Sequence, residues 1–195
     1  MLQVRGEMDE FPDVLQLVCS YLNETEIDYV VVGGIAVMHH GVPRTTVDID
    51  LILQIDDDEI PAFVKFLNST GFTATTKDMR SAFKEKSHST IFYRDSLLRL
   101  DIQGVNSQFD KMTLERAIDI ELFNTTIKLG TAEDTIINKI LFQGEQDLRD
   151  ALGIFARKQR QLDIAYIEST CKKLEIYDKW VHFLKDSTDK IKDTG

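Results

Sequence analysis

The stretch that decides the fold is VVGGIAVMHHGVPRTTVDIDLIL, residues Val31 to Leu53. Two glycines end a short apolar run, a segment of helical length follows, and two aspartates then bracket one isoleucine inside a second apolar run. This pattern predicts strands at Tyr29–Val32 and Val47–Leu53, with a short helix at Ile35–His40 between them. A strand of this kind has one buried face, so the two like charges on it need a chemical explanation.

The two charges are Asp48 and Asp50, which we expect on the same face of the second strand, because side chains at i and i+2 point the same way. Their separation along the strand is about 6–7 Å. Carboxylates this close repel each other, and one pKa rises unless a cation lies between them. Hard divalent cations such as Mg²⁺ take oxygen ligands and bind substrate phosphates. The pair therefore indicates a metal site; the alternative is a solvated pair on an exposed strand edge, which the apolar flanks TTV and LIL disfavour.

The glycine pair, Gly33 and Gly34, lies at the predicted junction of strand and helix. Backbone N–H groups can approach a phosphate closely there, and the N-terminus of the following helix favours an anion. Glycine pairs also occur in ordinary tight turns, so this feature is weak by itself. The chain between Gly34 and Asp48 is long enough for one short helix and a return to an adjacent strand. We therefore expect the glycine turn and the aspartates to face one crevice.

This arrangement resembles the signature of nucleotidyltransferases of the DNA polymerase beta superfamily, which is a Gly-Gly or Gly-Ser turn, a helix and an apolar-flanked Asp-x-Asp. A third carboxylate lies on a later strand in that superfamily. Asp101 in LLRLDIQ has this place here, since it is offset from the apolar residues Leu100 and Ile102; an ordinary acid on a strand face is the alternative.

Two longer segments narrow the resemblance. The first segment is similar to the minimal and AbiEii-like nucleotidyltransferases of abortive-infection and toxin-antitoxin systems, and it reads GGIAVMHHGVPRTTVDIDLIL. The second is similar to a later segment of the same group, and it reads TAEDTIINKILFQGEQDLRDALGIF. The resemblance covers about Tyr29–Phe155.

The resemblance implies a role for each residue of the first motif. Asp48 and Asp50 would hold one or two Mg²⁺ or Mn²⁺ ions, and Asp101 would complete the metal site on the side of the attacking hydroxyl. The amides of Gly33 and Gly34 would hold the β- and γ-phosphates of an NTP such as ATP.

The resemblance also implies roles outside these motifs. Arg44 would meet a phosphate or a site carboxylate, and a structural salt bridge is the open alternative. Lys139 would direct its charge at the triphosphate and act with the three aspartates in catalysis, whereas a lysine on a helix is ordinarily a solvated surface residue. Asp150 is expected to orient Lys139, and Asp147 is the weaker candidate for that role.

The predicted fold class is α+β, a nucleotidyltransferase fold with a small mixed sheet flanked by helices and followed by a C-terminal helical region. The predicted domains are an α/β core at residues 1–130 and a helical region at residues 131–195 that packs on the core. Besides a helix that begins after Thr131, the apolar periodicity predicts helices at Pro12–Asn23, Ile60–Asn68, Met112–Ile118, Leu148–Lys158, Ile164–Leu174 and Tyr177–Asp189. It predicts further strands at Gly71–Thr76, Ser89–Tyr93, Leu97–Gln103 and Glu121–Leu129, and Asn124 is a candidate position for a bend in the last of these.

Composition limits the function classes. The 195 residues carry 33 acids against 23 Lys and Arg, a net charge of -10, which opposes non-specific binding to a polyanion. Cys19 and Cys171 form no CxxC pair, and we expect reduced thiols packed in helices and a cytoplasmic location. No apolar run approaches the roughly 18 residues of a membrane span, and no signal-peptide pattern is present. Basic clusters at Lys77–Arg99 and Arg157–Arg160 leave an RNA path open, with solvated loop charge as the alternative.

The expected activity is metal-dependent transfer of a nucleoside monophosphate from an NTP to an RNA of tRNA-like form, a protein or a small molecule, with release of pyrophosphate. A toxin-antitoxin or phage-defence setting follows from the resemblance alone. Two alternatives stay open: a catalytically silent module that binds a partner protein, and a phosphodiesterase that uses the same carboxylates.

Overall fold

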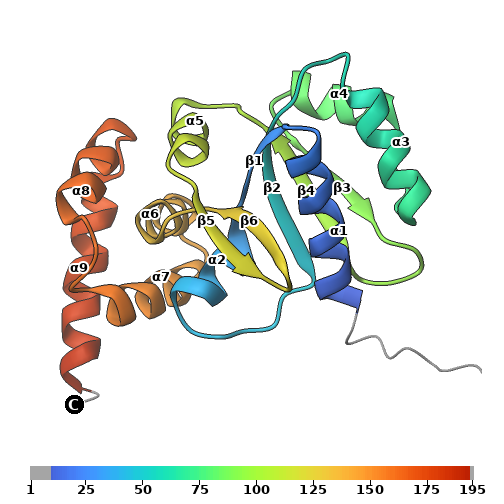
Figure 1. The fold of residues 1–195 in the computed structure, drawn as a ribbon. Helices are drawn as coiled ribbons and strands as arrows, with labels where there is room; N and C mark the ends of the chain where they lie inside the picture. The colour runs from blue at the N-terminus through green and yellow to red at the C-terminus, as the bar shows by residue number, and fades with distance from the viewer. Residues whose placement is uncertain (1–9, 194–195) are drawn as a thin grey trace, which may run out of the picture. The chain divides into compact units, whose positions relative to one another are not determined.

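The strand that carries Asp48 and Asp50 forms part of a six-stranded mixed sheet with the order β3-β4-β2-β1-β6-β5 (Figure 1). The computed structural model describes residues 10–193, and side chains to residue 187. The strands are β1 (Asp28–Val31), β2 (Asp48–Gln54), β3 (His88–Phe92), β4 (Arg99–Gly104), β5 (Ile118–Leu122) and β6 (Thr125–Leu129). The helices are α1 (Glu10–Glu24), α2 (Gly33–His40), α3 (Ile60–Thr70), α4 (Thr76–Lys84), α5 (Gln108–Glu115), α6 (Ala132–Phe142), α7 (Glu145–Lys158), α8 (Ile164–Lys173) and α9 (Tyr177–Asp193).

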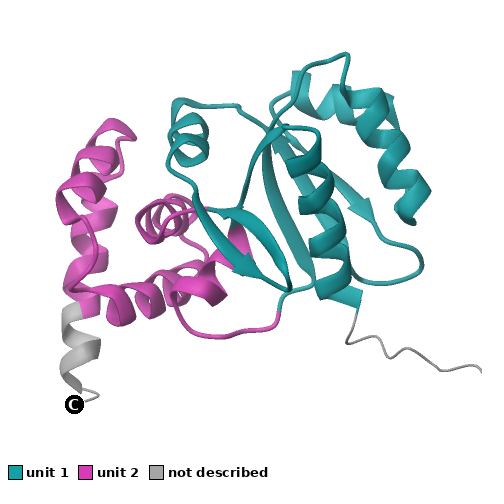
Figure 2. Cartoon of the chain, in the orientation of Figure 1, with its two compact units in different colours: residues 1–32, 46–129 teal, residues 33–45, 130–195 magenta. Residues whose placement is uncertain are grey.

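The described chain divides into two compact units (Figure 2). Unit 1 comprises residues 1–32 and 46–129, and unit 2 comprises residues 33–45 and 130–195. This division differs from the predicted domains because residues 33–45, which include α2, belong with the C-terminal helices. The expected packing of the helical region on the α/β core stays a prediction.

Unit 1 contains the whole sheet, and its register gives the sheet one apolar and one partly polar face. β2 runs parallel to β4 and antiparallel to β1. Paired residues share a face, so Ile49 and Leu51 of β2 lie on the same side as Leu100 and Ile102 of β4, and all four are buried. Helix α1 contacts β1 and β6, and Ser20 of α1 makes a hydroxyl–hydroxyl hydrogen bond of 3.2 Å with Thr125 of β6.

Unit 2 is helical, and its core forms around aromatic residues of α7 and α9. The ring of Phe155 lies 6.1 Å from that of Trp180 and 5.7 Å from that of Phe183 between centroids. Trp180 is fully buried. Helix α2, which begins at the glycine turn, packs against α6 and α7 within the same unit. It therefore belongs to the core of unit 2.

The predicted fold class is confirmed in its elements: the chain combines a mixed six-stranded sheet with helices. Both cysteines are buried free thiols in helices, as expected. Burial raises the pKa of Cys19 to about 12 and that of Cys171 to about 11, so both thiols stay protonated and unreactive. Between residues 10 and 193, no helix is both long enough and apolar enough to cross a membrane.

One predicted strand was wrong, and two other predicted elements have different bounds in the structure. Gly71–Thr76 is not a strand: it contributes only an isolated bridge from Phe72 to Tyr93, and α4 begins at Thr76. The segment Glu121–Leu129 contains the end of β5 and all of β6, and the bend indicated at Asn124 is the turn of this hairpin, where Phe123 and Asn124 have positive φ. The helix predicted at Met112–Ile118 is α5, which begins earlier because Ser107 caps it in a capping box.

Candidate active site

Three aspartates gather on the partly polar face of the sheet in unit 1. Asp48 and Asp50 occupy alternate positions of β2, and Asp101 of β4 is the register partner of Asp50. Neighbouring strands lie about 4.7–4.9 Å apart, so Asp50 and Asp101 stand side by side on one face. The structure therefore brings together the three carboxylates that the sequence singled out.

Arg99 also belongs to this face, and sequence reasoning did not assign it to the site. It is the register partner of Asp48. Its Nη2 atom lies 2.8 Å from Oδ1 of Asp48, and its Nε atom lies 3.4 Å from Oδ2 of Asp101. The hydroxyl of Thr90 on β3 donates a hydrogen bond to Asp101. The alternation Arg99-Leu100-Asp101 was the available signal, because it places arginine and aspartate on the same side of β4.

The donor chemistry of this face suits a hard divalent cation, since carboxylate oxygens are the ligands that Mg²⁺ and Mn²⁺ prefer. Among the residues whose side chains the structure describes, no three His, Cys, Asp or Glu side chains are spaced to hold a metal ion. Instead, the guanidinium of Arg99 supplies positive charge to two of the three carboxylates. The metal-binding role of Asp48, Asp50 and Asp101 thus stays a prediction.

The glycine pair begins α2 in unit 2. Gly33 has φ of 59°, in the left-handed region that glycine adopts without strain. Gly34 follows in the first turn and is buried. The sequence explains this turn, because a residue with a Cβ at position 33 would meet steric strain. The predicted phosphate-binding role of the two amides is not tested by the structure.

An ion-pair cluster around the buried Asp150 joins α6, α7 and the loop before β2 within unit 2. Nζ of Lys139 lies 2.7 Å from Oδ1 of Asp147 and 3.5 Å from Oδ2 of Asp150. Nε of Arg44 lies 3.5 Å from Oδ1 of Asp150. Only 12% of the Lys139 side chain and 4% of the Asp150 side chain are exposed. The low exposure of Lys139 excludes the ordinary solvated lysine.

This cluster corrects one prediction and informs another. Asp147, which the sequence ranked as the weaker partner of Lys139, makes the shorter contact and accepts a hydrogen bond from it. Asp150 contacts Lys139 as expected, but it also contacts Arg44. The alternative of a structural salt bridge for Arg44 therefore describes its contact in the structure.

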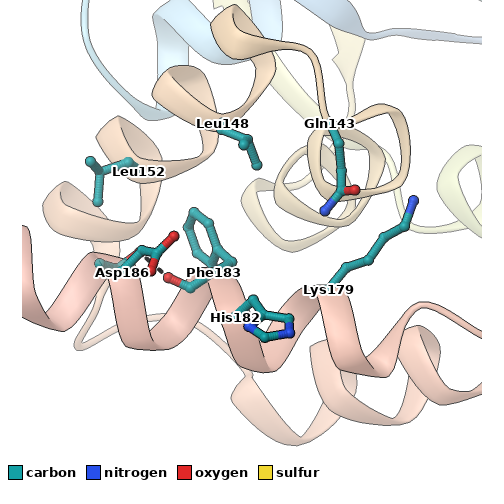
Figure 3. Close-up of a pocket in the computed structure, with 8 residues that line it drawn as sticks. Gln143, Leu148, Leu152, Lys179, His182, Phe183 and Asp186 are labelled. Atoms are coloured by element: carbon teal, nitrogen blue, oxygen red, sulfur yellow. Dashed lines mark hydrogen bonds between the residues drawn. The ribbon is translucent and has the colours of Figure 1, made fainter.

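Two pockets in unit 2 lie near these helices. One borders the cluster, and its lining includes Val37, Val42, Arg44, Arg149 and Asp150. The other lies between α7 and α9 and combines apolar and charged side chains (Figure 3). Its labelled lining residues are Gln143, Leu148, Leu152, Lys179, His182, Phe183 and Asp186. No residue predicted for the site lines this second pocket.

Comparisons with known proteins agree with the fold and refine the resemblance. The family model described as aminoglycoside-2''-adenylyltransferase matches residues 14–167. An antigenic nucleotidyltransferase-like protein from Paracoccidioides brasiliensis is similar in structure, with a TM-score of 0.55, 20% identity and coverage of 76% of each chain. The antibiotic-resistance factor ANT(2'')-Ia has a TM-score of 0.57 and 10% identity, with 88% of this chain and 96% of the other covered. Among curated proteins no sequence match was found.

The nucleotidyltransferase prediction is confirmed at the level of the superfamily. The narrower resemblance to AbiEii-like enzymes has no support, because the family model that matches most of the chain is described as aminoglycoside-2''-adenylyltransferase. The predicted toxin-antitoxin setting has no support in these matches.

Proposed function

The chain belongs to the aminoglycoside-2''-adenylyltransferase family, and we propose that it transfers a nucleoside monophosphate, most simply AMP from ATP, to a hydroxyl of a small molecule. Pyrophosphate is the second product. The observation that carries the proposal is the grouping of Asp48, Asp50 and Asp101 on one sheet face in a chain of this family. A silent copy has no need to hold three acids on the face of a half-buried strand pair.

The family narrows the acceptor from the three classes that the sequence left open. Its description names an aminoglycoside, which is a small polyhydroxylated cation. The net charge of -10 agrees with a cationic acceptor and disfavours RNA, a polyanion. We therefore place small hydroxyl-bearing molecules, and cationic ones first, ahead of RNA or a protein.

The three aspartates divide the work of the transfer. Asp48 and Asp50 would hold Mg²⁺ or Mn²⁺, and the chemistry supplied by the bound ion is polarisation of the phosphate oxygens and stabilisation of the leaving charge. Asp101 would accept the proton of the attacking hydroxyl. The acceptor oxygen forms a bond to the α-phosphorus, the bond from that phosphorus to the bridging oxygen breaks, and pyrophosphate leaves with the electron pair.

The residues of unit 2 would act on the triphosphate. The N–H groups of Gly33 and Gly34 are suited to the β- and γ-phosphates, because they begin a helix. Lys139 and Arg44 would supply positive charge, and Asp150 would position both, since it contacts each of them. These roles rest on the family resemblance together with the low exposure of Lys139 and Asp150.

An acceptor screen tests the proposal. Each α-³²P-labelled NTP is incubated with Mg²⁺ or Mn²⁺, the full-length protein, and either total RNA or a panel of small hydroxyl compounds that includes aminoglycosides. Asp48→Asn serves as the inactive control. We expect label on a small molecule with the wild-type protein only. Label on RNA alone would overturn the assignment of the acceptor, and NTP binding without transfer to any acceptor would favour a regulatory module.

A further inference from the structure

Arg99 has an unusual place for an arginine, because it stands among the acids that the proposed function assigns to a metal. It shares a sheet face with Asp48, Asp50 and Asp101, as the parallel register of β2 and β4 requires. It contacts Asp48 at 2.8 Å and Asp101 at 3.4 Å. A single guanidinium therefore bridges the two strands that carry all three carboxylates.

The bridging guanidinium supplies the kind of charge compensation that a divalent ion would supply. Acids grouped on one face repel each other, and a nearby cation relieves that repulsion. The planar fork of arginine suits this task, since it can donate to two carboxylates at once. Arg99, Asp48 and Asp101 are each only partly exposed, so these contacts are less screened than contacts of fully exposed groups.

The guanidinium and a metal ion compete for the same oxygens. Mg²⁺ binds carboxylate oxygens at about 2.0–2.1 Å and demands near-octahedral geometry. Oδ1 of Asp48 and Oδ2 of Asp101 already contact the positive charge of Arg99. A metal ion at the same atoms would be repelled by that charge. A metal ion that takes Oδ1 of Asp48 or Oδ2 of Asp101 as a ligand would therefore require Arg99 to give up its contact with that atom.

We propose that Arg99 is a resident competitor of the divalent cation, which holds Asp48 and Asp101 together before the metal binds and lowers the affinity of this face for the free ion. The inference rests on the proposed function, because it assumes that the three aspartates are metal ligands. It assigns to Arg99 a positioning role, which neither the fold nor the chemistry of nucleotidyl transfer requires.

The test is a titration of the full-length protein with Mn²⁺ alone, followed by the electron paramagnetic resonance signal of the free ion. Arg99→Gln removes the competing charge, and we expect it to bind Mn²⁺ about three- to tenfold more tightly than the wild type, a modest factor because partly exposed ion pairs are weak. Arg99→Lys keeps a charge that reaches fewer acceptors and should lie between the two.

Arg80→Gln is the matched control for net charge. Arg80 also lies in unit 1 and pairs with an aspartate, Asp57, at 2.8 Å, but neither residue is on the three-aspartate face. This variant changes the total charge by the same amount, so its Mn²⁺ affinity should equal that of the wild type. A gain in Arg80→Gln as large as that in Arg99→Gln would show a general charge effect and overturn the inference.

A thermal measurement adds a second readout. Without metal, Arg99→Gln should melt at a lower temperature than the wild type, because the acids lose their cation, and saturating Mn²⁺ should raise its melting temperature by more. If Arg99→Gln does not fold, the intermediate affinity of Arg99→Lys carries the test. If the wild type binds Mn²⁺ and the Arg99 variants bind it equally well or more weakly, the inference about Arg99 is overturned, whereas the proposed function is not.

Failure of the proposed function gives a different result. Asp48→Asn/Asp50→Asn is titrated beside the others. If the wild type binds no Mn²⁺, or binds it as well as this double variant does, the aspartates are not the metal ligands, and the proposed mechanism falls together with the inference.

Discussion

Lys139 makes ion pairs that give it a testable structural role, apart from the catalytic role proposed for it. Its ammonium lies between Asp147 and Asp150 of α7, with little of the side chain exposed. Because Asp150 is buried, its charge has already lost the stabilisation that water would give it. Removing an ion-pair partner would leave that cost uncompensated and would destabilise the protein. Arg44 is the other contact of Asp150, at 3.5 Å.

Lys139→Met should therefore lower the free energy of unfolding by about 1–3 kcal/mol, less than for a fully buried pair because Arg44 remains beside Asp150. Urea unfolding followed by circular dichroism measures the change. Lys111→Met is the control, since Lys111 makes an exposed ion pair with Glu115, and its substitution should cost under about 1 kcal/mol. An unchanged midpoint for Lys139→Met would show that the cluster is not structural.

His40 predicts a pH dependence of stability. It is buried, and one ring nitrogen lies 2.7 Å from the carbonyl oxygen of Gly130. Burial lowers the pKa of His40 below its usual 6.5, with a smaller opposing effect from that hydrogen bond. The unfolded chain then binds this proton at a higher pH than the folded chain does, so stability is lost as the pH falls through about 6.5.

The measurement is the urea midpoint at about pH 7.5 and about pH 5.5. The wild type should lose more stability between the two than His40→Asn does, because the variant has no imidazole to protonate. His182→Asn removes an exposed histidine and should keep the wild-type difference. Equal losses in His40→Asn and the wild type would contradict the account.

The site was predictable from the sequence to the extent that it depends on local geometry. Alternation within a strand placed Asp48 beside Asp50, whereas Asp101 was identified by the family resemblance together with its offset from apolar neighbours. The contact of Arg99 with Asp48 was not predictable, because it depends on the register between two strands far apart in the sequence. The shorter contact of Lys139 with Asp147 likewise depends on how α6 packs against α7.

At the scale of elements, the C-terminal end of α2 and helix α7 approach closely at Gly41, the residue that follows α2. A Cβ built on Gly41 would lie 2.8 Å from Cγ1 of Ile154 and 3.1 Å from its backbone nitrogen. The side-chain contact can adjust, but the backbone contact needs the two segments to move apart. Gly41 is thus required for the packing of α2 on α7.

Gly41→Ala should destabilise the protein by about 1–3 kcal/mol, as overpacking of a core does. The control is Gly104→Ala on β4, where the nearest atom to a built Cβ is 3.5 Å away, an ordinary contact. Its cost should stay below about 1 kcal/mol. Urea unfolding compares the two, and equal costs would contradict the importance of the close approach.

The elements that the sequence missed had local signals of their own. Thr75-x-x-Asp78 opens α4 with the threonine side chain accepting from the amide of Asp78, and Thr131-x-x-Asp134, which was recognised, does the same for α6. The apolar residues near Phe72 favoured a strand over this cap. The β5–β6 turn was signalled only by Asn124, because its other residue, Phe123, occupies a left-handed position that usually belongs to Gly or Asn.

At the scale of the whole molecule, the family and the charge act together. A net charge of -10 opposes the binding of polyanions, whereas it would attract a small cationic acceptor of the kind proposed. The basic clusters at Lys77–Arg99 and Arg157–Arg160 include side chains with partners inside the fold: Arg99 contacts Asp48, and Arg157 donates to the carbonyl of Gly41. These residues serve the fold and the site, which weakens the case for an RNA path.

Asp48 and Asp50 of β2 are proposed to be required for nucleotidyl transfer. The most direct test is the transfer rate of Asp48→Asn/Asp50→Asn, compared with the wild type and with Asp119→Asn, which changes an exposed aspartate of β5. We expect the rate of the double variant to fall at least about 100-fold, with its unfolding midpoint nearly unchanged, and the rate of Asp119→Asn to equal that of the wild type. Transfer at the wild-type rate by a folded double variant would contradict the account.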